Sequence, residues 1–143
     1  MKQRWEMAEQ PAGFSEREHT ADWELEVWAP DLSMLLEQSA RGMYSLSGTR
    51  LQPEPRLRRE LEISAADPES LLVNFLAELL YLGEQAGLGF DSFDLRVTDD
   101  TLHALLEGAS LAGQDKEIKA VTYHNLQIRN GPRGLEARIV FDV

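Results

Sequence analysis

The sequence predicts an α+β fold, a two-layer sandwich in which a mostly antiparallel sheet of six to seven strands packs on two main helices. Segments in which apolar and polar residues alternate recur near both ends of the chain. Two longer segments carry apolar residues at helical spacing, each after a capping aspartate.

The first part of the chain supplies a strand pair and a helix. We expect strands over 14–18 and 23–28, because tryptophan, leucine and valine alternate with glutamates in the second segment. Asp31 then caps a helix that carries leucine, alanine and methionine at helical spacing and ends near Ser47.

Proline and glycine delimit the next two elements. A strand is expected over 57–64, after a proline-flanked stretch. Asp67 then caps the clearest helix of the chain, with Pro68 at its first position, where a missing N–H group costs nothing. A leucine-rich face follows, and Gly87 ends the helix.

The C-terminal half is predicted to be mostly strand, over 90–97, 102–111, 121–129 and 135–141. The segment 102–111 also fits a helix, and the antiparallel context favours a strand. Residues 130–134, with two glycines and a proline, are expected to form the hairpin connection to the last strand.

Composition indicates a single globular domain. The chain has 143 residues and no cysteine, so it can form neither a disulfide nor a thiolate metal site. It has no apolar run long enough to cross a membrane and no signal peptide at its start, so we expect a cytoplasmic protein. We expect residues 1–13 to form a flexible tail and residues 14–143 to form the domain.

The net charge of −11 bears on the partners. A surface of this sign repels phosphate backbones, which argues against direct, stable nucleic-acid binding. It favours basic protein partners or cations, and the alternative is that the charge only maintains solubility.

A candidate metal site combines the side chains of Asp22 and Asp142 with the α-carboxylate of Val143. In the last strand, Asp142 lies on the polar side with Glu136 and Arg138. If the first and last strands are neighbours, both aspartates share one end of the sheet. Oxygen ligands alone would select Ca²⁺ or Mg²⁺, or Mn²⁺, over zinc. The alternative is that two aspartates so far apart in sequence are ordinary surface residues.

The other candidates for chemistry are weak. His19, His103 and His124 form no i, i+4 pair of the kind that binds zinc, and structural or surface roles are favoured for all three. A triad of Ser15, His19 and Asp22 would lack both a nucleophile elbow and an oxyanion turn.

Three motifs in order resemble the archease family. They are His-Thr-Ala-Asp at 19–22, Glu-Ile-Lys-Ala-Val-Thr-Tyr-His at 117–124 and Phe-Asp-Val at 141–143, and the helical segments 40–43 and 71–81 match as well. The resemblance covers the chain from about residue 14 to its last residue. It departs at Asn125, where the family often has an aspartate, in a shorter loop over 108–116, and in the N-terminal extension.

The resemblance implies a protein without catalytic activity of its own. Archeases activate the RtcB-type tRNA-splicing ligase, an RNA ligase that uses GTP and Mn²⁺, by promoting its guanylylation and multiple turnover. The family's metal, calcium, would be bound here by Asp22, Asp142 and Val143. Residues that would lie near the metal or contact the partner are His19, Lys119, Tyr123 and His124. Two alternatives remain: a metal-dependent hydrolase, and a general chaperone or scaffold.

Overall fold

The computed structural model describes residues 11–18 and 22–143. The elements in chain order are β1 (Gly13–Glu18), β2 (Asp22–Ala29), α2 (Leu32–Ser47), β3 (Arg50–Leu51), β4 (Leu57–Ser64), α3 (Pro68–Ala86), β5 (Leu88–Thr98), β6 (Thr101–Gly113), β7 (Ala120–Thr122), β8 (Arg129–Gly131) and β9 (Gly134–Asp142). Most of the tail expected over 1–13 lies outside the described residues.

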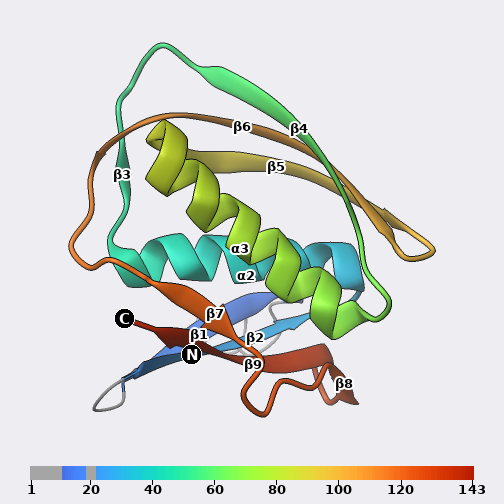
Figure 1. Cartoon of the computed structure of the whole chain (residues 1–143). Coiled ribbons are helices and arrows are strands. Elements are labelled where there is room, and N and C mark those ends of the chain that lie inside the picture. The colour runs from blue at the N-terminus through green and yellow to red at the C-terminus, as the bar shows by residue number, and fades with distance from the viewer. Residues whose placement is uncertain (1–10, 19–21) are drawn as a thin grey trace, which may run out of the picture.

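The α+β class with antiparallel pairing is confirmed, but the strands form two sheets instead of one. The first sheet has the order β1-β2-β9-β7, with β8 also paired to β9, and the second has the order β3-β6-β4, with β5 also paired to β6. Helices α2 and α3 lie between the two sheets (Figure 1). Alternation along a strand indicates which side is buried but not which strand it pairs with, so the sequence does not separate one sheet from two.

Both helices begin and end where their capping residues predict. The side chains of Asp31 and Asp67 each accept a hydrogen bond from the backbone N–H three residues on, at 2.9 and 2.7 Å. Gly48 and Gly87 close the two helices in the left-handed conformation, at φ 66° and 65°. Pro68 occupies the first turn of α3, as expected.

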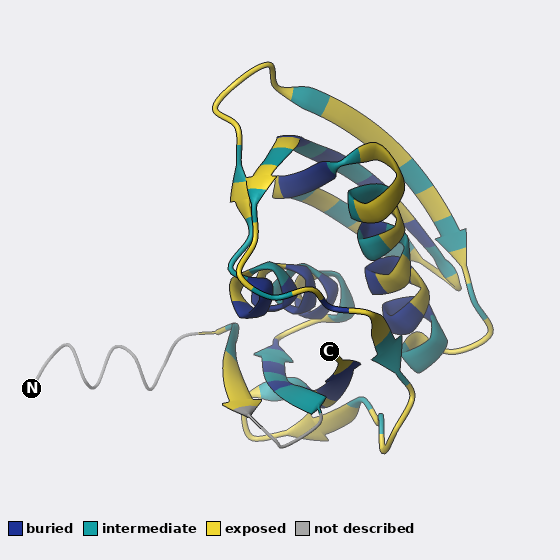
Figure 2. Cartoon of the chain, turned by 60° about the vertical axis from the view of Figure 1, so that its left-hand side comes forward, coloured by how far each residue is buried: buried dark blue, intermediate teal, exposed yellow. Residues whose placement is uncertain are grey.

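The core lies between each sheet and the helix layer. Buried residues follow the inner faces of both helices and the inward sides of the strands (Figure 2). The largest fully buried side chains are Phe75, Phe141, Leu25, Leu35, Leu36, Met43, Leu72, Leu76, Leu79, Leu102, Leu106 and Ile139. Within the described part of the chain, no helix combines the length and apolar character needed to cross a membrane.

Two segments of the C-terminal half had uncertain or continuous strand predictions, over 102–111 and 121–129. The ambiguous segment 102–111 is strand, because it lies inside β6, which pairs with β3, β4 and β5. The continuous strand predicted over 121–129 is wrong, since only its two ends are strand. Asn125 has a positive φ of 52°, and the N–H of Ile128 donates to the Glu69 side chain at 3.0 Å instead of to a neighbouring strand.

An exposed ion-pair cluster fastens the segment before β4 to the second sheet. The guanidinium of Arg56 donates a hydrogen bond to each carboxylate oxygen of Asp91, and the distance from Nη1 to Oδ2 is 3.2 Å. It also donates to the carboxylate of Glu107, at 3.3 Å. The hydrogen bonds from Arg56 hold the pKa of Asp91 below its ordinary value of 3.8. The stability that the Arg56–Asp91 pair contributes to the folded state is therefore complete at pH values above the ordinary pKa of an aspartate. It is lost as the pH falls through the lowered pKa of Asp91.

Replacing Arg56 by alanine is expected to destabilise the fold at pH 7, by less than about 1 kcal/mol because the pair is exposed. Urea unfolding from pH 7 to pH 2 should show the difference from wild type shrinking to zero at the acid end. Arg58→Ala is the control, because Arg58 forms no ion pair within residues 11–18 and 22–143. A difference for Arg56→Ala that is independent of pH would contradict the assignment.

Candidate functional site

Strand β9 brings the two predicted ligands together. It lies between β2 and β7, and its last residue, Asp142, is the register partner of Asp22 on one side and of Ala120 on the other. The strands that carry the two aspartates, β2 and β9, are therefore adjacent, whereas the first strand, β1, pairs with β2 and not with β9. Figure 1 shows the C-terminus at this edge of the sheet. Directly opposed residues of antiparallel strands carry their side chains on one face, with Cβ atoms about 4.5–5.5 Å apart.

The two aspartates lie on the outer face of the sheet. Their neighbours Trp23 and Phe141, also register partners, point inward, and Phe141 is completely buried. Because successive residues of a strand alternate between faces, Asp22 and Asp142 point away from the helices. Asp142 is exposed and Asp22 is half-buried, so a ligand can reach both from solvent.

Backbone and apolar contacts fix the end of β9. The N–H of Lys119 donates to the carbonyl of Asp142 at 2.8 Å, which extends the pairing with β7 by one residue. Ile118 is buried, and the side chain of Val143 packs against the core. The backbone at Asp142 is therefore held by contacts on the side of β7 as well as on the side of β2.

The loop before β7 is anchored to the end of α2. The N–H groups of Asp115 and Lys116 both donate to the carbonyl of Ser47, at 2.8 and 3.1 Å, and Arg50 pairs with Asp115 at 2.7 Å. The ammonium of Lys116 lies 4.2 Å from the centre of the Trp23 ring, a cation–π contact. These contacts connect the strand end that carries the two aspartates to the helix layer.

Two carboxylates at directly opposed positions repel each other and attract a cation. Like charges facing each other across a strand pair are unfavourable, and a cation between them removes the repulsion. Oxygen donors with room for further ligands suit a hard divalent ion. Among the described residues, no group of three histidine, cysteine, aspartate or glutamate side chains converges to hold a metal, so the pair needs donors other than such side chains.

The remaining predicted residues lie elsewhere. Tyr123 and His124 follow the end of β7, and three residues of strand separate Tyr123 from the position opposite Asp142, roughly 10 Å. The His124 ring forms a hydrogen bond with Asn125 at 3.2 Å, and Tyr123 is 54% exposed. Lys119 borders a cavity beside α3. His19 lies outside the described residues.

The sequence reasoning missed an arginine cluster farther along the same outer face. Arg133 and Arg138 gather around Glu26, at 3.0 and 3.8 Å. The alternation of the last strand places Arg138 on the side of Asp142, and that signal was available. The pairing of β2 with β9, which brings Glu26 opposite Arg138, was needed to complete the cluster.

Comparisons with known proteins support a family assignment. The family model described as the Archease protein family matches residues 14–143. The chain is 32% identical over 126 residues to protein archease of Thermococcus gammatolerans, a match that covers 82% of this chain and 88% of the relative. It is 31% identical over 146 residues to protein archease of Methanosarcina barkeri, covering 96% and 100% of the two chains.

Solved structures agree in fold. The crystal structure of an archease of Thermotoga maritima, described as a possible chaperone, superimposes with a TM-score of 0.68 at 22% identity, covering 90% of this chain and 96% of that one. The solution structure of a protein of Methanobacterium thermoautotrophicum gives a TM-score of 0.67 at 26% identity, covering 92% and 99%. With its motifs, its fold and a family model that spans all but its first residues, the chain belongs to the archease family.

Proposed function

We propose that the protein is a non-catalytic activator of an RtcB-type RNA ligase in tRNA splicing or RNA repair. It promotes the GTP-dependent guanylylation of the ligase and its multiple turnover. Membership of the archease family supports this function. The single structural observation that carries the proposal is the direct opposition of Asp22 and Asp142 at an exposed edge of the sheet.

The working site in this proposal is a divalent metal at that edge. Asp22 and Asp142 supply the two side chains, and the α-carboxylate of Val143 is the third proposed donor. Calcium is the proposed ion, with Mg²⁺ or Mn²⁺ as the other hard cations that oxygen donors accept. When bound, the ion would neutralise the opposed carboxylates. A partner with basic surfaces fits the acidic character of the chain.

The alternative of a metal-dependent hydrolase lacks a supporting observation. Such an enzyme needs a substrate-sized pocket beside the metal. Asp22 and Asp142 line neither the cavity beside α3, nor the groove along β9, nor the depression on the outer face of the second sheet. A general chaperone or scaffold is tested by the variants below.

The test is a reconstituted ligation with the cognate ligase, GTP, Mn²⁺ and RNA ends that carry a 2′,3′-cyclic phosphate and a 5′-hydroxyl. Asp22→Asn and Asp142→Asn are expected to lower the stimulation of both guanylylation and turnover, by about tenfold or more for the double variant. The change preserves shape and removes charge from an opposed like-charge pair, so stability should stay equal or rise slightly.

The matched control is Asp94→Asn, which removes the same charge from an exposed position of the second sheet. Thermal unfolding with CaCl₂, MgCl₂ or MnCl₂ gives a second measurement, because a ligand that binds only the folded state raises the melting temperature. Wild type should respond to one of these salts and the double variant should not. If the double variant stimulates the ligase fully, the proposed site is wrong and the scaffold alternative is favoured.

A further inference from the structure

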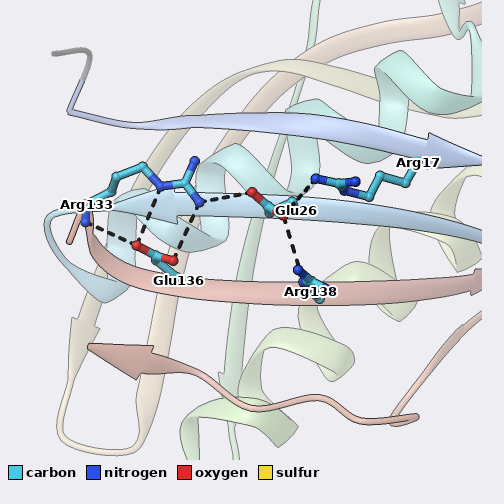
Figure 3. Close-up of polar contacts among 5 residues, drawn as sticks. All are labelled: Arg17, Glu26, Arg133, Glu136 and Arg138. Carbon is cyan, nitrogen blue, oxygen red and sulfur yellow. Dashed lines mark hydrogen bonds and ion pairs between the residues drawn. The ribbon is translucent and has the colours of Figure 1, made fainter. Parts of the chain in front are cut away.

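The outer face of the first sheet contains a groove of about 950 Å³ beside the last strand. We call it the arginine groove, and it lies between β9 and the chain segment from 123 to 131. Its polar lining includes Arg129, Arg133 and Arg138 together with the amides of Asn125 and Gln127. Figure 3 shows how Arg17, Arg133 and Arg138 converge on one glutamate across β1, β2 and β9.

Arginines outnumber carboxylates in this cluster. Glu26 is shared by three guanidinium groups, at 3.0 Å from Arg133, 3.6 Å from Arg17 and 3.8 Å from Arg138. Glu136 pairs with Arg133 at 3.5 Å. Two carboxylates cannot neutralise three guanidinium groups, so these five side chains keep one excess positive charge in a chain whose net charge is −11.

The arginines of the groove have two roles: Arg133 is held by contacts within the protein, whereas Arg129 and Arg138 are exposed. Arg133 stacks over the ring of Trp28 at 4.0 Å and bonds to both glutamates, so its guanidinium is fixed. Its hydrogen bonds also hold the pKa of Glu136 below the ordinary value of 4.5. The Arg138 side chain is 64% exposed, and Arg129, also exposed, donates to the neutral amide oxygen of Gln127 at 2.9 Å. Arg129 and Arg138 are therefore available to an anionic ligand.

We propose that the arginine groove binds a single strand of RNA, with Arg129 and Arg138 contacting its phosphates. Tyr123 borders the groove and is 54% exposed as a residue, which suits stacking of a base on its ring. Asn125, Gln127 and Asn130 border it with amides that both donate and accept hydrogen bonds, as base edges require. An acidic peptide could pair with the same arginines but would bring no base to stack on Tyr123, and the test below includes such a peptide.

The groove lies on the same face as the opposed aspartates. Arg138 precedes Asp142 by four residues of one strand and points to the same side, roughly 13 Å away. A strand of RNA held in the groove would therefore run beside the edge that the proposed function assigns to the ligase. The choice of RNA rests on that proposed function. The net charge argues against RNA binding by the surface as a whole, and the arginine groove is a local exception.

The test measures the fluorescence anisotropy of a labelled single-stranded RNA of about 20 nucleotides as the salt concentration rises from a low value. Binding weakens as salt rises, and each phosphate contact adds about 0.7 to the magnitude of the slope of log K against log salt for single strands. The double variant Arg129→Ala with Arg138→Ala should therefore reduce the magnitude of that slope by about 1.4. Arg58→Ala with Arg96→Ala removes the same charge from exposed strand positions of the second sheet and should leave the slope unchanged. Tyr123→Ala should weaken binding about tenfold with an unchanged slope.

The ligase assay separates this inference from the proposed function. Guanylylation of the ligase without RNA should be the same with the Arg129/Arg138 variant as with wild type, while the KM for RNA in ligation should rise. The inference is wrong if wild type does not bind the RNA at low salt, if both arginine pairs have equal effects, or if a polyglutamate peptide binds in place of RNA. If wild type binds the RNA but does not stimulate guanylylation of the ligase, the proposed function alone is contradicted.

Discussion

Replacing Gly108 by alanine is expected to cost more than about 3 kcal/mol, a large part of the stability of a domain of this size. Gly108 lies in β6, at the centre of the second sheet, opposite Phe90 of β5. A Cβ atom there would overlap the backbone carbonyl oxygen of Gly89 and lie 2.7 Å from the Cα of Phe90. The register of β5 and β6 also shifts between Phe90 and Ser92 at this point, as at a β-bulge.

The reason for the large cost is that backbone atoms cannot rotate away as a flexible side chain can. Gly83→Ala is the matched control, because a Cβ there would meet its nearest atom, the carbonyl oxygen of Leu88, at an ordinary 3.5 Å. Alanine inside helix α3 should stabilise by up to about 1 kcal/mol. Urea unfolding of both variants decides the matter, and equal midpoints for Gly108→Ala and wild type would refute the close approach.

Local chemistry determines the elements that the sequence predicts well. The helices are bounded by Asp31, Asp67, Gly48 and Gly87, each of which satisfies backbone groups through contacts within a few residues. The two sheets were not predicted, because a strand's alternation does not identify its partner. The failure over 121–129 has a related cause, since the contact of Ile128 with Glu69 joins residues 59 positions apart.

The candidate site was partly predictable for the same reasons. Alternation places Asp142 on the polar side of its strand, and the pairing of β2 with β9 brings Asp22 opposite it. The cluster around Glu26 could not be derived, because it needs the register of three strands and the position of Arg133 in the hairpin. The cavity beside α3 also depends on tertiary packing, where segments distant in sequence meet.

Replacing Phe141 by alanine is expected to cost about 3–5 kcal/mol, the usual range for a phenylalanine truncated in a packed core. Phe141 is fully buried and lies between its register partners Trp23 and Val121. Removal of the Phe141 ring leaves a cavity beneath the last paired residues of β9. Thermal and urea unfolding should both report the loss, and an unchanged midpoint would show that the strand end contributes little to the core.

The neighbouring positions 141 and 142 separate stability from function within one strand. Phe141→Leu keeps most of the buried volume and should cost less than about 1.5 kcal/mol, with ligase stimulation near that of wild type. Asp142→Asn should keep the stability and lose the stimulation, whereas Phe141→Ala should lose both, because a loosened strand end no longer holds Asp142 opposite Asp22. If Phe141→Ala stimulates fully at a temperature where it remains folded, the fixed position of Asp142 is unnecessary, and only its charge matters.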